Sequence, residues 1–460
     1  MMKSFSIILT IPTLAFALFF PSPQAYAAPG FVDSLAGRGR LGIPLDQARQ
    51  LEARLGQLLV INVDGFGSSG TLALAPGFAG LVERLQVGGV IPHYGSTDYA
   101  KIVRTNRALA ELTRLPLLIC SDIVRLKAPA AAAPGGAGGG ASVQGQAPAV
   151  ASFGDGYEGG FLGRYRDLPD RELRTLARLN AFVFRALGMN VALGPTVDAS
   201  TAEPRVVERA RLVLDEMKRF GLAPVLKHYP TLPAGANLHR ESPDTRIPAA
   251  EMAERAAAFR ALAPGAGIMM TTHFLDSVVD PGIVTFSSAW NAILRAQTGF
   301  RGLLMTDGLL MLKNYADRTA ISGSLSGGSS MGLGARDAAG VDQAAVWAAR
   351  AILAGHDMVI VEGSAAQTTR AFEGLLTLAC AGTVTGDRLA ARITESWKRI
   401  SDWKEARAAL LRGRIDVPPA TIQAIIALLP GEGSALAAFH FAPAALALLE
   451  PALAAGEAGP

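Results

Sequence analysis

Eight short apolar segments constrain the fold of this chain more than any other sequence feature. They cover residues 58–63, 88–92, 116–120, 189–194, 223–226, 267–271, 301–305 and 356–361. Continuous apolar runs, unlike alternating ones, are typical of strands that are covered on both faces. Stretches with helical spacing of apolar residues, such as 98–112 and 203–220, separate most of these segments. Strands that alternate with helices predict an α/β protein with parallel strands.

The ends of these segments favour one closed arrangement. Each segment finishes in or beside an ionisable residue: Asp64, His93, Asp122, Asp198, Lys227 with His228, His273, Asp307 and Glu362. A doubly wound sheet would give the same local pattern, but a (β/α)8 barrel brings the carboxyl ends of all eight strands to one mouth, where active sites are built. We therefore predict a TIM-type (β/α)8 barrel over residues 40–410. We expect two or three of the polar residues to be structural.

The first 27 residues have the pattern of a secretory signal peptide. Lys3 precedes an almost wholly apolar run over residues 5–20, and the small residues Ala25 and Ala27 suit a signal peptidase. An uncleaved anchor is the alternative, but the apolar run is short for a spanning helix. We expect export to the periplasm or medium, a mature protein that begins near Ala28, and no stable membrane span after cleavage.

Charge and cysteine content exclude several classes of protein. The net charge of +4 is spread over mixed acids and bases, without a basic run long enough to predict nucleic-acid binding. Cys120 and Cys380 lie in apolar segments far apart in the sequence, which favours two buried thiols over a disulfide. We expect neither a metal site nor an organic cofactor.

Three regions depart from the strand and helix pattern. Residues 128–160 are rich in Ala, Gly and Pro and predict a flexible insertion after the third strand. Residues 322–334 are rich in Gly and Ser and predict a mobile flap after the seventh strand. Residues 411–460 are predicted to be a C-terminal helical extension on the outside of the barrel; an oligomer or membrane contact is the alternative.

Two segments carry the residue types of glycoside chemistry. Residues 299–308 place Asp307 at the tip of an apolar strand, and a retaining glycosidase needs a rigidly held carboxylate to attack the anomeric carbon. A cap of the following helix is the structural alternative for this residue. Lys227 and His228 end the fifth segment, and their compact donors can bind sugar hydroxyl groups.

Together these segments resemble glycoside hydrolase family 3, and within it the single-domain β-N-acetylhexosaminidase branch. The resemblance runs in order from about residue 51 to residue 401. Residues 227–230, Lys-His-Tyr-Pro, are similar to the Lys-His-Phe-Pro motif of the family. Residues 116–122 resemble the strand that carries a substrate-binding Asp, and residues 299–308 resemble the nucleophile segment. The resemblance implies that Asp307 is the nucleophile and that Asp122, Lys227 and His228 bind the sugar.

The general acid lies where the chain departs most from the family. The branch uses a His on the loop after the fifth strand, in an Asp-Ser-His pattern. His239 is the matching residue, because the stretch His-Arg-Glu-Ser-Pro at 239–243 is similar to the sequence at the family's catalytic His. Asn237 stands where the orienting Asp belongs. The Glu-Gly-Gly-Arg-Val motif expected after Asp122 is absent from the sequence, and the sugar-binding Arg after the fourth strand has no clear match.

These patterns predict a retaining exo-glycosidase that removes β-linked N-acetylglucosamine from cell-wall-type glycans through a glycosyl-enzyme on Asp307. Two alternatives stay open. A β-glucosidase of the same family generally takes its acid from an added C-terminal domain, which we do not expect in the residues that follow this barrel. A non-catalytic sugar-binding barrel would explain the missing motifs.

Overall fold

The fold is described by a computed structural model that covers residues 30–63, 76–92, 99–126, 149–153, 162, 165, 167–197, 205–230, 249–276, 279, 282–315, 340–429 and 450. Several predictions fall outside these residues. They concern the signal peptide, Asp64, His93, Asp198, the loop with Asn237 and His239, and the flap at 322–334. Within the described ranges, no helix combines the length and the apolar character needed to cross a membrane.

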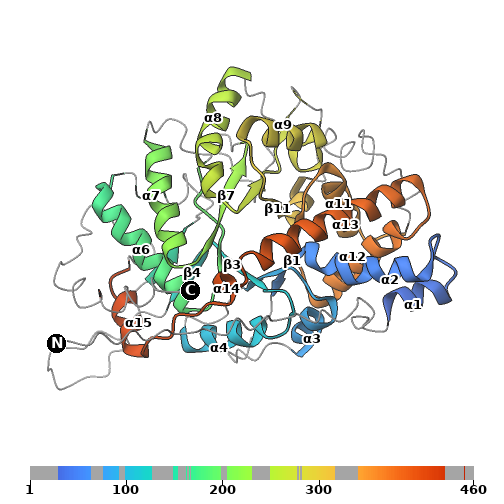
Figure 1. The fold of residues 1–460 in the computed structure, drawn as a ribbon, viewed down its shortest axis with the longest axis horizontal. Coiled ribbons are helices and arrows are strands. Elements are labelled where there is room, and N and C mark those ends of the chain that lie inside the picture. Colours follow the sequence, from blue (N-terminus) through green and yellow to red (C-terminus); the bar gives the residue numbers. More distant parts are fainter. Residues whose placement is uncertain are drawn as a thin grey trace, which may run out of the picture.

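Eight parallel strands close into a barrel, which confirms the predicted (β/α)8 fold (Figure 1). Each strand lies within or overlaps one of the eight apolar segments. In barrel order the strands are β1 (Leu59–Val63), β2 (Gly89–Pro92), β3 (Leu118–Ser121), β6 (Val191–Ala192), β7 (Ala223–Tyr229), β8 (Ile268–Thr271), β11 (Leu303–Gly308) and β12 (Met358–Val361). The last strand pairs with the first, with Val60 opposite Ile360, so the sheet has no open edge.

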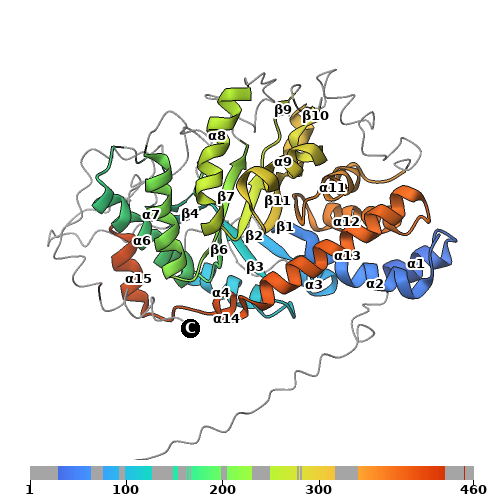
Figure 2. The same cartoon turned by 45° about the horizontal axis from the view of Figure 1, so that its top comes forward.

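A ring of helices covers the outside of the barrel (Figure 2). Between consecutive barrel strands lie α3 (Pro76–Leu85), α4 (Tyr99–Ala110), α6 (Asp170–Ala186), α7 (Val206–Arg219), α8 (Ala249–Leu262), α9 (Ser288–Thr298) and α11 (Gln343–Ala354). The chain enters through α1 (Phe31–Gly37) and α2 (Leu45–Leu55) and leaves through α12 (Ala365–Ala379) and α13 (Val384–Glu405). Every described residue of the barrel strands except Ile91 and Asp307 is buried, as expected for strands inside such a ring.

The insertion after the third strand is flanked by two paired strands, which the sequence did not predict. Its central part lies outside the described residues, but residues 149–152 form β5 (Ala149–Ser152), which pairs antiparallel with β4 (Ile123–Leu126). Just after this hairpin, the N–H of Phe153 donates to the carbonyl of Asp122 at 2.9 Å, and the Phe153 ring meets Phe184 edge-on. A regular hairpin therefore anchors the ends of a segment whose composition suggested only a flexible loop.

The described residues after α13 form two short helices. Two short helices, α14 (Ala408–Arg412) and α15 (Pro419–Ile426), follow α13, and α15 contacts α6 on the outside of the barrel. Arg185 at the end of α6 donates to the carbonyls of Leu410 and Gly413, which ties this extension to the barrel. Both cysteines are free and buried, which confirms the prediction of two buried thiols.

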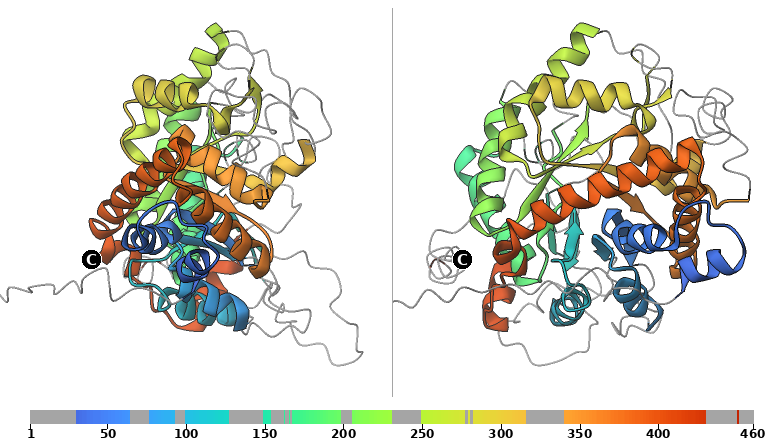
Figure 3. Two further views of the ribbon diagram at one scale, coloured as in Figure 1. Left: turned by 90° about the vertical axis from the view of Figure 1, so that its right-hand side faces the viewer. Right: turned by 45° about the vertical axis from the view of Figure 1, so that its right-hand side comes forward.

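The long helix α13 crosses the amino-terminal end of the barrel (Figure 3). A Cβ on Gly267, just before β8, would lie 2.9 Å from the Trp403 ring. Arg399 donates to the carbonyl of Gly302, just before β11, at 3.0 Å. Lys404 donates to the carbonyl of Gly88, just before β2, at 2.7 Å. One helix thus covers the starts of three barrel strands.

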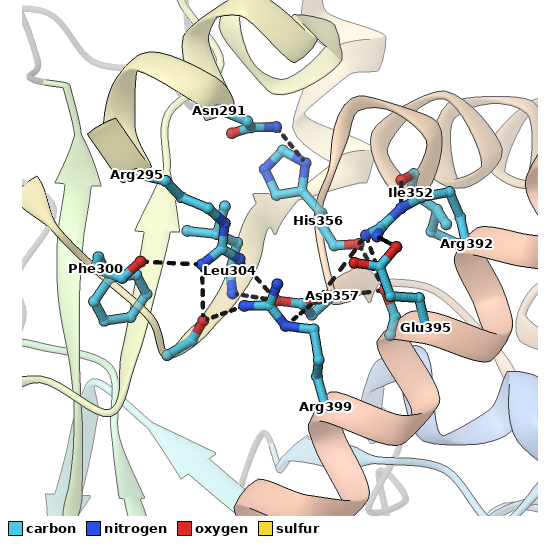
Figure 4. A network of polar contacts seen from close by, with 12 residues as sticks. Asn291, Arg295, Phe300, Leu304, Ile352, His356, Asp357, Arg392, Glu395 and Arg399 are labelled. Carbon is cyan, nitrogen blue, oxygen red and sulfur yellow. Dashed lines mark hydrogen bonds and ion pairs between the residues drawn. The ribbon is translucent and has the colours of Figure 1, made fainter. Parts of the chain in front are cut away.

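A buried carboxylate joins this helix to the last two strands (Figure 4). Asp357 is fully buried and accepts hydrogen bonds from the N–H of Leu304 at 3.0 Å and from Arg295 of α9 at 3.2 Å. Arg399 and Arg392 of α13 lie 3.4 and 3.9 Å from the same carboxylate. Burial raises the pKa of Asp357, and the guanidinium charges and the Leu304 amide oppose that effect only in part.

Lys404 is a second buried charge at this end of the barrel. Its amine is fully buried and donates to Gln57 Oε1 at 2.9 Å and to the Gly88 carbonyl at 2.7 Å. Burial lowers the pKa of Lys404 from 10.5 to about 7. Its two acceptors match the two hydrogens of a neutral amine.

We predict that Lys404 makes stability rise with pH above neutrality. Because the pKa is lower in the folded state than in the unfolded state, the unfolded chain binds more protons between about pH 7 and 10.5, so unfolding becomes less favourable as pH rises. Relative to Lys404→Met, the wild type should gain on the order of 2–3 kcal/mol between pH 7 and 9.5, measured by urea unfolding. Lys398→Met, at an exposed position of the same helix, is the control. An equal effect of Lys404→Met at all pH values would contradict the prediction.

Candidate active site

Four of the five predicted site residues come together at the carboxyl ends of neighbouring strands. Asp122 follows β3, Lys227 and His228 lie near the end of β7, and Asp307 lies near the end of β11. The Lys227 amine is 3.5 Å from Asp122 Oδ2, and His228 Nε2 is 3.8 Å from Asp307 Oδ2. The fifth residue, His239, lies outside the described residues. The convergence of strand ends therefore brings together the residues that the sequence singles out.

The Asp307 carboxylate is held but remains accessible. Its side chain is 19% exposed, and Oδ1 accepts a hydrogen bond from the N–H of Gly308 at 2.8 Å. Burial alone would raise the pKa of Asp307. The positive charges of His228, His273 and Lys227, with the Gly308 N–H, outweigh burial and hold that pKa below its usual value. Asp307 is therefore ionised at neutral pH, as a nucleophile must be.

Lys227 and His228 are consecutive on β7, and both side chains lie beside acidic residues at the mouth of the barrel. The peptide bond between them is cis. Lys227 pairs with Asp122, which follows β3, and His228 pairs with Asp307 on β11. The Lys227 and His228 side chains are buried, whereas the Asp122 side chain is 38% exposed. This arrangement presents ammonium, imidazole and carboxylate groups to a ligand at the mouth, and such groups can bind several hydroxyls of one sugar.

Two further polar residues around Asp307 were not recognised as site residues in the sequence. His273 follows β8 and is fully buried, and its Nε2 lies 2.9 Å from the carbonyl oxygen of Gly308. Glu362 follows β12, and its Oε2 accepts a hydrogen bond from the N–H of Leu310 at 3.1 Å. Both residues end predicted strands, but only the fold shows that they hold the backbone next to Asp307.

The backbone of Gly308 packs directly against a carboxylate. A Cβ at position 308 would lie 2.6 Å from the Glu362 carboxylate, closer than real Cβ contacts. A larger residue after Asp307 would therefore require the Glu362 side chain to move. The structure supports this turn from both sides, through His273 and Glu362.

Among the described residues, no group of three or more His, Cys, Asp or Glu side chains is arranged to hold a metal ion.

The sequence of residues 50–401 matches the glycosyl hydrolase family 3 N terminal domain. The chain belongs to this family. It is 25% identical over 175 residues to a beta-hexosaminidase of Xanthomonas oryzae, and 29% identical over 182 residues to a beta-hexosaminidase of Nitrosomonas eutropha. Each match covers 34% of this chain, and the chain spans about half (52%) of the length of each of these relatives.

Solved structures support the same fold at low sequence identity. A family 3 beta-N-acetylglucosaminidase from Paenibacillus superposes with a TM-score of 0.58 at 20% identity, covering 89% of this chain and 68% of that one. A beta-N-acetylhexosaminidase from Beutenbergia cavernae gives a TM-score of 0.54 at 20% identity, covering 77% and 98% of the two chains. At this identity the likeness concerns the barrel itself.

Proposed function

We propose that this protein is a retaining exo-β-N-acetylhexosaminidase that removes β-linked N-acetylglucosamine from cell-wall-type glycans. The observation that carries the proposal is an ionised, partly exposed Asp307 at the barrel mouth, flanked by His228 and by the Lys227–Asp122 pair. The names of the similar proteins, beta-hexosaminidase and beta-N-acetylglucosaminidase, support the choice of an amino sugar.

The proposed reaction has two steps at the anomeric carbon. Asp307 attacks that carbon and forms a covalent glycosyl-enzyme, while His239 gives its proton to the departing glycosidic oxygen. His239 then takes a proton from water, whose oxygen displaces Asp307 and releases the sugar with retained configuration. Lys227, His228 and Asp122 bind and orient the sugar hydroxyls during both steps.

The role of Asp307 predicts that Asp307→Ala abolishes turnover. We expect kcat on an aryl β-N-acetylglucosaminide to fall on the order of 10³-fold or more, because no other group supplies the nucleophile. Azide added to this variant should restore activity and yield the α-glycosyl azide, since the small anion occupies the place of the lost carboxylate. Asp402→Asn, at an exposed carboxylate of α13, is the control and should leave kcat unchanged.

The same assay distinguishes the alternatives. Faster release from an aryl β-glucoside than from the N-acetylglucosaminide would favour a β-glucosidase. Binding of N-acetylglucosamine without turnover of either substrate would favour the non-catalytic barrel. Near-normal kcat in Asp307→Ala would remove Asp307 from the mechanism.

The proposed acid predicts a strong dependence on the leaving group. Asn237 can orient His239 but adds no negative charge to stabilise its imidazolium form, so protonation of the leaving group should limit the rate. His239→Ala should slow substrates with poor leaving groups far more than aryl glycosides of acidic phenols. Asn237→Asp should raise kcat on poor leaving groups on the order of tenfold, which corresponds to about 1.4 kcal/mol. If Glu241 already supplies the charge, Glu241→Gln should be costly instead. An equal effect of His239→Ala on all substrates would assign the acid elsewhere.

We also propose that the protein is exported, because the first 27 residues have the pattern of a cleaved signal peptide. Mass spectrometry of the protein from its producing cell should give a mature N-terminus close to Ala28. A soluble cytoplasmic form that retains Met1 would contradict export.

A further inference from the structure

The hydrogen-bond partners of His273 determine its protonation state. The ring is fully buried between the end of β8 and the backbone at Asp307 and Gly308. Its Nε2 lies 2.9 Å from the carbonyl oxygen of Gly308, and its Nδ1 lies 2.6 Å from Thr285 Oγ1 of the short helix η4 (Val284–Phe286). A carbonyl oxygen can only accept, so Nε2 must carry a hydrogen.

The hydrogen bonds of the Thr285 hydroxyl indicate whether the second ring nitrogen, Nδ1, carries a hydrogen. This hydroxyl has one hydrogen, and its oxygen lies 2.8 Å from the Thr272 carbonyl oxygen; because a carbonyl oxygen can only accept, we assign the hydroxyl hydrogen to that contact. The hydrogen of the 2.6 Å contact must then come from His273 Nδ1. Both nitrogens are therefore donors, which is the hydrogen-bond pattern of an imidazolium ion.

A second buried histidine in the same barrel shows the opposite pattern. His356 Nδ1 lies 3.0 Å from the carbonyl oxygen of Ala351 and donates to it, and Nε2 lies 2.8 Å from Thr271 Oγ1. Within the described residues the Thr271 hydroxyl makes no other hydrogen bond, so it can donate to Nε2. One donor and one acceptor are the pattern of a neutral ring, and burial lowers the pKa of His356 to about 3. The two rings differ in the assigned direction of the threonine hydrogen and in one further contact, because Asn291 Nδ2 lies 3.4 Å from His356 Nδ1.

We propose that His273 is held as a buried imidazolium ion that acts as a positioning residue for Asp307. Its charge stabilises the carboxylate, and its Nε2–H fixes Gly308, whose own N–H binds Asp307 Oδ1 at 2.8 Å. The protonation state stands on hydrogen-bond geometry alone. Its consequence for catalysis rests on the proposed role of Asp307 as nucleophile.

The surrounding charges are consistent with a cation at this place. The ionisable groups near it on the adjoining elements are Asp307 on β11, Lys227 and His228 on β7, Glu362 after β12, His356 before β12 and Arg350 on α11. The positive charge of His273 helps to lower the pKa of Asp307 and also lowers that of His356. The Asp307 carboxylate on β11 thus offsets the cation, whereas the positive charges of Lys227 and Arg350 act against it.

The direct test is the protonation of the ring, which needs no activity. In protein labelled with ¹⁵N-histidine, long-range ¹H–¹⁵N spectra would be recorded from pH 6 to 8, with the two rings assigned by loss of their signals in His273→Gln and His356→Gln. Only six histidines contribute signals. We expect both nitrogens of His273 to be protonated throughout, and one nitrogen of His356. A single protonated nitrogen on His273 over this range would overturn the proposal.

The catalytic consequence is tested with His273→Gln, which can keep an N–H donor toward Gly308 but removes the charge. We expect kcat to fall on the order of tenfold with little change in KM, and the acid limb of the kcat/KM profile to move to higher pH as Asp307 loses its counter-charge. His356→Gln, at equal depth, should leave the acid limb in place. An unchanged limb and kcat in His273→Gln would overturn the positioning role. Activity that survives Asp307→Ala, with His273 still doubly protonated, would refute the proposed function but not the imidazolium.

Discussion

The buried Asp357 carboxylate fixes the alignment of the two strands that position Asp307. At the amino-terminal end of the barrel it accepts the N–H of Leu304, while its own N–H donates to the Leu304 carbonyl at 2.8 Å. Further along the same pair of strands, the N–H of Ile360 donates to Thr306 Oγ1 at 3.0 Å. The register then shifts before Gly308, so Asp307 lies at the irregular end of an otherwise fixed pair. Truncating Asp357 would leave guanidinium groups from α9 and α13 without their shared anion, which is costly in a buried site.

Two carboxylates at opposite ends of the barrel are each surrounded by positive charges, yet their pKa values shift in opposite directions. Asp357 has three arginines around it, yet burial still raises its pKa. Asp307 has two histidines, a lysine and a backbone N–H around it, and its pKa is lowered. Burial raises the pKa of both carboxylates, so the two sites differ in how strongly the neighbouring groups oppose it. Burial therefore outweighs the neighbouring charges at the base, and the neighbouring charges outweigh burial at the mouth.

The sequence predicted what depends on local pattern and on the convergence of strand ends. Eight apolar segments gave the barrel, and the residues after them gave Asp122, Lys227, His228 and Asp307 as neighbours. The sequence could not show that His273 turns inward, because a buried and an exposed histidine at a strand end look the same in a sequence. Its partner Thr285 comes from a segment with no distinguishing signal.

The roles of other residues could not be predicted because their partners are distant in the sequence. Asp357 and Lys404 are single polar residues in apolar surroundings, and their partners lie on segments distant in the chain. The β4–β5 hairpin lies at the ends of a low-complexity stretch, whose composition says nothing about pairing across it. These features depend on packing between elements, which no local pattern records.

Asp307 and His239 of the proposed site differ in how closely the surrounding sequence follows the family pattern. Asp307 is supported through His228 on β7 and His273 after β8, whereas His239 lies outside the described residues, in a segment where the sequence departs from the family. The departure at Asn237 changes none of the residues that surround Asp307. Sugar binding alone does not require an ionised carboxylate among three positive groups, since neutral groups can bind hydroxyls. The charge arrangement around Asp307 therefore favours catalysis over a purely binding role.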